Sequence, residues 1–134
     1  MARMILVTGA LGQIGTELVP ALRERYGADR VVASDIRIPA KQTMIAAGPF
    51  EHLDCTGSHE IGDVVRRYEI DAIFHLAALL SAVAEDKPQA AWTLNMGGLY
   101  SVLEIARQNG CAVFFPSSIG AFGPTTPRDG TPQD

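Results

Sequence analysis

The fold of this chain is decided by Thr8-Gly9-Ala10-Leu11-Gly12-Gln13-Ile14-Gly15. Before it stands the apolar run Met4-Ile5-Leu6-Val7, which is typical of a parallel strand buried on both faces. After it, residues 13–26 predict a helix that ends at Gly27. The glycine spacing is G-x-x-G-x-x-G, one residue longer in its first gap than the dinucleotide-binding fingerprint.

Each glycine of this loop has a physical purpose. Gly9 permits a tight turn as the chain leaves the strand, Gly12 lets the backbone approach a pyrophosphate, and Gly15 lets the helix pack close to the sheet. The phosphates would then meet free N–H groups at the positive end of the helix. The alternative is an ordinary glycine-rich turn, but the strand-to-helix context favours a dinucleotide site. We expect it to be formed by Gly9, Leu11, Gly12, Gln13, Ile14 and Gly15.

An acidic residue follows at the expected distance. Asp35 comes directly after the second expected strand, Arg30–Ser34, and twenty residues after Gly15. A carboxylate there can accept both ribose hydroxyls and repels a 2′-phosphate, which favours NAD over NADP. The alternative is an aspartate that caps a turn at the strand end. Arg37 complicates the preference, because a nearby arginine can accept a 2′-phosphate. The ribose contacts are expected from Asp35, Ile36 and Arg37.

Strand and helix signals alternate along the rest of the chain. This alternation predicts an α/β fold of the Rossmann type, a doubly wound parallel sheet with strand order 3-2-1-4-5. We expect an NAD-binding unit at residues 1–122 and an irregular, proline-containing tail at 123–134. The further elements expected are a strand at Phe50–Asp54, a helix capped by Ser58 that runs to Glu69, a strand at Ala72–Leu76, a helix from Pro88 to Asn109, and a strand at Cys111–Phe115.

Composition excludes several classes of protein. The chain has 134 residues, which suits one domain, and its 47% hydrophobic and 19% charged residues are typical of a globular protein. A net charge of −4 argues against nucleic acid or an anionic membrane as a partner. No apolar run approaches the roughly 20 residues that span a bilayer, and no leader pattern is present. Cys55 and Cys111 lack metal-ligand spacing. We expect reduced thiols, no metal and a cytoplasmic protein.

Four segments together resemble the extended short-chain dehydrogenases/reductases, the epimerase/dehydratase group. They are Thr8–Gly15, Asp71–Ala78, Leu94–Gly98 and Ser117–Gly123, in the order that this group shows. Within the group, three stretches are most similar to the short-chain type of L-threonine 3-dehydrogenase: His75–Ser81, Ala91–Met96 and Pro116–Arg128. The resemblance covers the whole chain.

The resemblance implies a role for further residues. Ser118 would hydrogen-bond the reacting oxygen, Ser117 would lie beside cofactor and substrate, and Ser81 beside the substrate. The alternatives are a strand-end turn serine for Ser118 and the start of a loop for Ser81. The remaining cofactor contacts would come from the pair Leu53 and Asp54 at the adenine, from the small-residue edge Leu76, Ala77 and Ala78, and from Asn95, which would help to hold the active-site backbone.

Two of these assignments have alternatives in which the residue has only a structural role. Asp54 could be a strand-end aspartate that caps the helix region at Ser58, and Asn95 could be a buried amide with only local hydrogen bonds. His75 stands between apolar residues, and we expect it to be structural and not catalytic.

One departure from the family matters more than any match. The family's base is a tyrosine in Tyr-x-x-x-Lys downstream of the serine pair, whereas Tyr26, Tyr68 and Tyr100 all lie upstream. Glu104 occupies the lysine position after Tyr100. We therefore expect the N-terminal portion of an enzyme, truncated before the remaining strands and the substrate lobe, and inactive by itself.

For the parent, the resemblance implies oxidation of the C3 hydroxyl of L-threonine to 2-amino-3-oxobutanoate with hydride transfer to NAD. It also implies a homodimer paired through a helix bundle that uses the helix beginning at Pro88 and a later helix. A nucleotide-sugar epimerase or dehydratase and a non-enzymatic NAD-binding module remain the alternatives, because fold alone does not decide function.

Overall fold

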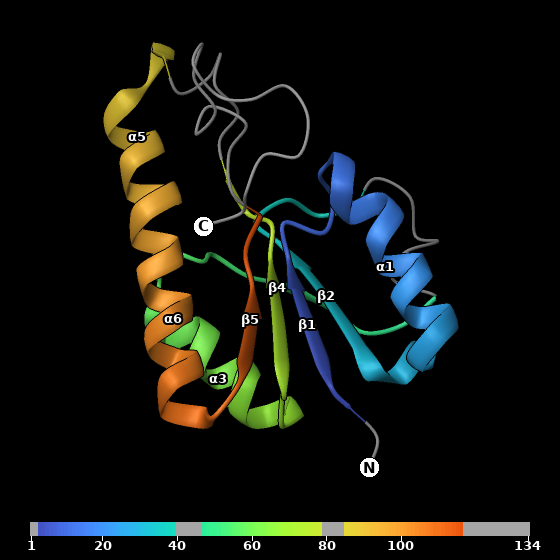
Figure 1. Cartoon of the computed structure of the whole chain (residues 1–134). Coiled ribbons are helices and arrows are strands. Elements are labelled where there is room, and N and C mark those ends of the chain that lie inside the picture. Colours follow the sequence, from blue (N-terminus) through green and yellow to red (C-terminus); the bar gives the residue numbers. More distant parts are fainter. Residues whose placement is uncertain (1–2, 40–46, 79–84, 117–134) are drawn as a thin grey trace, which may run out of the picture.

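A computed structural model describes residues 3–39, 47–78 and 85–116 of the chain. Its five strands form one parallel sheet in the order β3-β2-β1-β4-β5, which confirms the predicted topology. Helix α1 lies on one face of the sheet, and α3 and α6 lie on the other (Figure 1). The elements are β1 (Ile5–Thr8), α1 (Gln13–Tyr26), η1 (Ala28–Arg30), β2 (Val31–Asp35), β3 (Phe50–His52), α3 (Ser58–Tyr68), β4 (Ala72–His75), α5 (Pro88–Trp92), η2 (Thr93–Gly97), α6 (Gly98–Asn109) and β5 (Ala112–Phe114).

The core has two layers, one on each side of the sheet. Leu6, Val32 and Ile73 pack with the buried residues of α3 and α6. Ile5 and Val7 belong to the opposite layer, together with Val19 of α1. Side chains of β1 therefore alternate between two covered faces, which explains why its sequence is continuously apolar.

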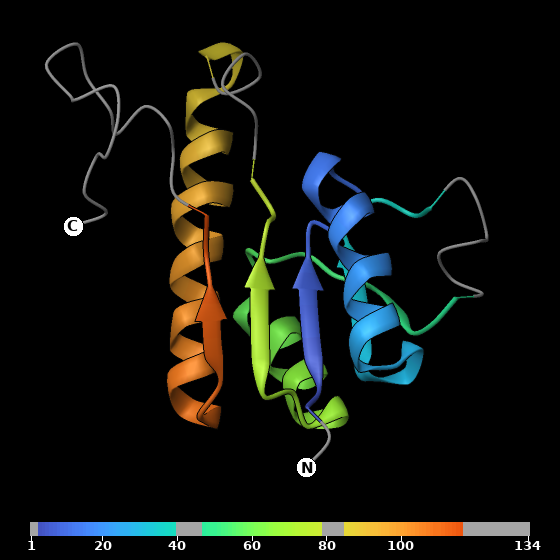
Figure 2. The same ribbon diagram turned by 45° about the vertical axis from the view of Figure 1, so that its right-hand side comes forward.

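Because all strands are parallel, their carboxyl ends meet at one edge of the sheet. Figure 2 shows β1, β4 and β5 side by side and the chain leaving the end of β1 for α1. Open α/β sheets bind their ligands at this edge. The glycine loop, the end of β2 and the end of β4 are all found there.

Several element ends differ from the sequence-based expectation by one or two residues. β1 and β2 extend one residue further than expected, to Thr8 and Asp35. β3 and β4 end earlier than expected, at His52 and His75. Arg30 belongs to the short helix η1. Cys111 and Phe115 lie outside β5, which spans Ala112–Phe114. Apolar side chains mark the buried part of a strand but not where its backbone pairing stops.

Two helix details differ as well. Gly57, not Ser58, is the N-cap of α3, and no side chain caps that end. The expected helix from Pro88 begins and ends as predicted, with Gly110 in the left-handed conformation at its C-terminus. In between, Thr93–Gly97 form a π-helical segment. None of the described helices is long and apolar enough to cross a membrane.

Candidate dinucleotide-binding site

Gly9 makes the turn between β1 and the loop. Its φ of +68° lies in the left-handed region that favours glycine. A Cβ added to Gly9 would also lie 2.6 Å from the backbone nitrogen of Ala77 and 2.7 Å from the carbonyl carbon of Leu76. The predicted tight turn is therefore confirmed, and the same glycine brings the loop against the backbone that follows β4.

Gly15 and Gly12 meet different surroundings. A Cβ on Gly15 would lie 2.5 Å from the carbonyl oxygen of Ala10, so Gly15 packs on the loop itself, whereas we expected it to approach the sheet. A Cβ on Gly12 would come within 4 Å of one atom of the described residues, the carbonyl oxygen of Gly9 at 3.3 Å. Protein packing thus explains the glycine at position 15 but not at position 12. A ligand that had to approach the backbone closely would account for a glycine at position 12.

The N-terminus of α1 has the properties of an anion site. Gly12 is its N-cap, no side chain caps the helix, and its first turn contains no acidic residue. The first N–H groups of a helix have no partner within the helix, and the helix dipole makes this end positive. The 14-residue helix therefore offers backbone donors beside the space left open at Gly12, which fits a pyrophosphate.

Asp35 lies beside this loop at the end of β2. Its Oδ2 accepts a hydrogen bond of 3.0 Å from the N–H of Leu11, and its Oδ1 accepts one of 2.9 Å from the N–H of Arg37. The guanidinium of Arg37 bonds both oxygens, at 3.2 and 3.4 Å. Burial opposes ionisation of Asp35, but the bonds from Arg37 and Leu11 outweigh it, so the pKa lies below its ordinary value. The carboxylate is charged at neutral pH and is held against the glycine loop.

Thr8 connects the ends of β1 and β4, a role that the sequence analysis missed. Its hydroxyl bonds Nδ1 of His75 at 2.7 Å and accepts the N–H groups of Leu76 and Ala77 at 3.2 and 3.4 Å. His75 is fully buried, and burial lowers its pKa to about 4. A neutral, buried ring bonded to a structural hydroxyl agrees with the expected structural role. Nothing in the sequence around Thr8 indicates its partner.

The other residues expected to contact the cofactor differ in burial and in hydrogen bonding. Leu53 is buried in the core, whereas Ile36 and Ile14 are each 57% exposed near the loop. The carboxylate of Asp54 bonds the N–H and hydroxyl of Thr56 at 2.9 and 2.6 Å, and these bonds lower its pKa. These bonds close the turn before α3 and do not cap that helix, whose N-terminus has no side-chain cap, so they differ from the helix-capping alternative.

Asn95 is half-buried in the π-helical segment η2. Leu76, Ala77 and Ala78 follow β4 at the carboxyl edge, as expected of a small-residue border. Ser81, Ser117 and Ser118 lie outside the described residues, as does the expected tail at 123–134. Their roles remain predictions.

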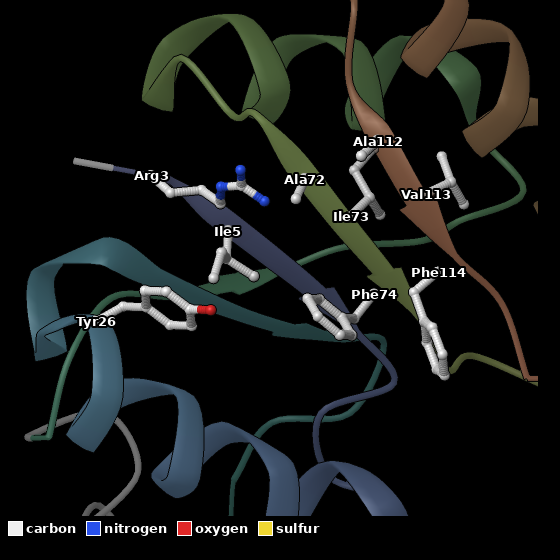
Figure 3. Close-up of a pocket in the computed structure, with 9 residues that line it drawn as sticks. All are labelled: Arg3, Ile5, Tyr26, Ala72, Ile73, Phe74, Ala112, Val113 and Phe114. Atoms are coloured by element: carbon white, nitrogen blue, oxygen red, sulfur yellow. The ribbon is translucent and has the colours of Figure 1, made fainter. Parts of the chain in front are cut away.

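A hollow of 160 Å³ lies elsewhere, on the face of the sheet that α1 leaves open (Figure 3). It crosses β1, β4 and β5 and is bordered by Tyr26 at the end of α1. Its lining is mostly apolar, and Arg3 and Tyr26 provide its charged and polar side chains. The hollow is thus separate from the glycine loop, and its lining includes no residue of that loop and not Asp35. The lining residues are Arg3, Ile5, Tyr26, Ala72, Ile73, Phe74, Ala112, Val113 and Phe114.

Two further kinds of site have no support in the part of the chain that the structure describes. No group of three or more histidine, cysteine, aspartate or glutamate side chains there could hold a metal ion. Cys55 and Cys111 are free thiols. Burial raises the pKa of Cys55 to about 12, so this thiol is not a nucleophile at neutral pH.

The sequence of this chain matches a known protein family and curated relatives. A family model described as the NAD dependent epimerase/dehydratase family matches residues 5–134. A protein of Staphylococcus epidermidis described as an uncharacterized epimerase/dehydratase is 54% identical over 131 residues, which are 98% of this chain and 41% of that protein. The chain thus spans less than half the length of that curated relative.

Two solved structures differ in how similar they are to this chain. The L-threonine dehydrogenase of Clostridium difficile is 50% identical, with a TM-score of 0.91 over 99% of this chain and 42% of its own. The UDP-glucose 4-epimerase of Thermus thermophilus, solved in complex with NAD, is 28% identical, with a TM-score of 0.70 over 80% of this chain and 34% of its own. The chain is therefore more similar to the dehydrogenase than to the epimerase.

Proposed function

This chain belongs to the NAD dependent epimerase/dehydratase family, and we propose that it is the NAD-binding part of an L-threonine 3-dehydrogenase. NAD is the cofactor of the family. The observation that carries NAD binding is the combination of an open Gly12, an uncapped positive helix end and the buried carboxylate of Asp35. The greater likeness to a threonine dehydrogenase than to a sugar epimerase supports the substrate.

In this proposal the loop and the end of β2 hold the adenosine half of the cofactor. The backbone from Leu11 to Gly15 binds the pyrophosphate, and Gly9 shapes the turn. Asp35, Ile36 and Arg37 border the ribose, and Leu53 and Asp54 lie toward the adenine. Since Leu53 is buried, it would act by shaping the wall behind the adenine and not through an exposed side chain.

The remaining proposed residues serve the reacting end. Leu76, Ala77 and Ala78 leave room beside the cofactor, and Asn95 holds the neighbouring backbone. Bound NAD supplies the acceptor for the hydride from C3 of threonine. Ser118 orients the C3 hydroxyl, Ser117 borders cofactor and substrate, and Ser81 borders the substrate. These three serines are proposed from the family motifs in the sequence.

The parent protein is then an oxidoreductase that converts L-threonine to 2-amino-3-oxobutanoate. We propose residues 1–122 as the NAD-binding unit and 123–134 as the segment that leads toward the substrate lobe of the parent. Threonine catabolism in the cytoplasm is the setting we propose, and the two free thiols agree with a reducing compartment.

Titration calorimetry of this chain with NAD and with NADP tests the cofactor. We expect tighter binding of NAD, and Asp35→Ala should narrow the difference because the ribose loses its acceptor and a 2′-phosphate loses its repulsion. Equal or tighter binding of NADP by the unaltered chain would reject the assigned preference.

An assay of the full-length parent tests the substrate. NADH formation with L-threonine and none with UDP-glucose is the expected result. Turnover of UDP-glucose or UDP-galactose without turnover of threonine would support the second candidate, a nucleotide-sugar epimerase or dehydratase. NAD binding without either activity in the parent would support a non-enzymatic NAD-binding module.

A further inference from the structure

The carboxylate of Asp35 is fully engaged in this structure. Its donors are the N–H of Leu11, the N–H of Arg37, and Nε and Nη2 of the Arg37 guanidinium. A carboxylate has about four acceptor positions, so these four donors occupy every acceptor position of Asp35. The two hydroxyls of a ribose can therefore bind Asp35 only if existing donors leave.

The four donors are not equally able to leave. The two backbone N–H groups belong to the glycine loop and to the chain directly after β2, and they are fixed by the fold. The Arg37 side chain is 63% exposed, whereas the Asp35 side chain is 4% exposed. Water can solvate the guanidinium after it moves, but the buried carboxylate needs a replacement donor. Arg37 is thus the partner that a ribose can displace.

We infer that Arg37 competes with the adenosine ribose of NAD for Asp35 and so determines how strongly the site prefers NAD over NADP. This inference rests on the proposed NAD-binding function. Before binding, the guanidinium occupies the acceptors that the ribose hydroxyls require, which weakens NAD binding. Once displaced, it leaves a cation beside the ribose, which favours a 2′-phosphate. Both effects reduce the preference that Asp35 alone would give.

Removal of the Arg37 side chain should leave Asp35 in place. The bonds from the N–H of Leu11 at 3.0 Å and from the N–H of residue 37 at 2.9 Å are both made by backbone and persist in Arg37→Ala. In that variant the Asp35 carboxylate stays where it is and has two acceptor positions free for a ligand. Its negative charge is no longer balanced by the Arg37 guanidinium.

Titration calorimetry of the whole chain with NAD and NADP tests this inference. For Arg37→Ala we expect NAD to bind about threefold to tenfold more tightly and NADP more weakly, since the ribose no longer competes and the 2′-phosphate meets an uncompensated carboxylate. Arg37→Gln should change both affinities in the same directions, and thermal melting of both variants verifies that they fold.

Arg66→Ala is the matched control. Arg66 is a half-exposed arginine of α3 that pairs with Asp63 at 3.0 Å, so its removal makes the same change in net charge away from the site. We expect both affinities to stay the same in this variant. Unchanged or weaker NAD binding in Arg37→Ala and Arg37→Gln would overturn the inference alone. An unaltered chain that binds neither nucleotide would reject the proposed function itself, and the inference with it.

Discussion

Thr8 and His75, which are 67 residues apart in the sequence, are joined by a buried hydrogen bond of 2.7 Å between Oγ1 and Nδ1. They are register partners at the ends of β1 and β4. The same hydroxyl oxygen accepts the N–H groups of Leu76 and Ala77. Nε2 of the ring has no hydrogen-bond partner among the described residues.

This arrangement predicts a loss of stability in mild acid. The pKa of His75 is about 4 in the folded chain, below its ordinary 6.5, because burial disfavours the charged ring. The unfolded chain therefore binds the proton more readily, and the stability that His75 contributes is complete above pH 6.5 and lost as pH falls toward 4. The size of this effect is about 3 kcal/mol. Denaturant unfolding across this pH range measures it.

His75→Asn gives the comparison for this prediction. Its amide oxygen can accept the Thr8 proton, but the side chain does not titrate. We expect a less stable protein whose free energy of unfolding depends less on pH below 6.5. His59→Asn is the control, because the His59 side chain is 87% exposed. The same pH dependence in His75→Asn and in the unaltered chain would contradict the prediction.

Substitutions in the glycine loop should separate folding from cofactor binding. Gly9→Ala forces a Cβ into a left-handed backbone and against Ala77, so we expect a loss of at least about 1–2 kcal/mol in the free energy of unfolding. Gly12→Ala makes one tight contact, at 3.3 Å from the carbonyl oxygen of Gly9, without a left-handed backbone, and should lose less stability than Gly9→Ala. NAD affinity in Gly12→Ala should nevertheless fall by tenfold or more, on the order of 1.4 kcal/mol, because the Cβ occupies the space proposed for the pyrophosphate.

Thermal melting and NAD titration of both variants test this pair. If Gly12→Ala kept the NAD affinity of the unaltered chain, the pyrophosphate would not lie against Gly12, and the proposed cofactor position would be wrong.

The parts of the fold that depend on local pattern could be predicted from the sequence. Alternating strands and helices predict the strand order, because parallel strands need right-handed crossovers, and the glycine spacing predicts the turn at Gly9, because a tight turn constrains the local backbone. The bond between Thr8 and His75 could not be predicted in the same way, since it depends on side chains that meet only after two strands align. The guanidinium of Arg37 on Asp35 was missed for the opposite reason. Arg37 and Asp35 are close in sequence, but the sequence does not show whether the Asp35 carboxylate binds the Arg37 guanidinium or a ligand. That outcome depends on the relative free energies of the two interactions.

The helix from α5 to α6 carries an exposed apolar stripe, and we predict that it joins two copies of this chain. Trp92, Met96, Tyr100 and Leu103 are 68, 47, 70 and 48% exposed and are spaced four, four and three residues apart, which places them on one helix face. The opposite face packs on α3 and the sheet. A continuous apolar face on a helix is typical of pairing with a like helix.

Light scattering over a concentration series tests this pairing. Tyr100→Glu places a charge in the centre of the stripe and should weaken self-association at least about tenfold. Ala21→Glu adds the same charge to an exposed position of α1 and should have no effect. A monodisperse monomer of the unaltered chain at high concentration would contradict the prediction.

The last prediction concerns the activity of this chain alone. Oxidation of an alcohol by hydride transfer leaves a hydroxyl proton that a base must accept, and a positioned base contributes about 10²–10⁴-fold in rate. The sequence contains no Tyr-x-x-x-Lys. Two titratable residues near the carboxyl edge of the sheet are already engaged, since the Asp54 carboxylate is bonded to Thr56, and His75 is buried with Nδ1 bonded to Thr8. A serine hydroxyl such as that of Ser118 is a poor base near neutral pH without assistance.

We therefore expect this chain to bind NAD and to form no NADH from L-threonine above a control without protein. The full-length parent, assayed under the same conditions, shows that the assay detects the reaction. Intact mass spectrometry of the preparation verifies that only the 134-residue chain is present. Threonine-dependent NADH formation by that preparation would contradict the prediction and would require another base within these residues. His75→Asn would then be tested first, because loss of the new activity in that variant, with NAD affinity retained, would identify the ring as the proton acceptor.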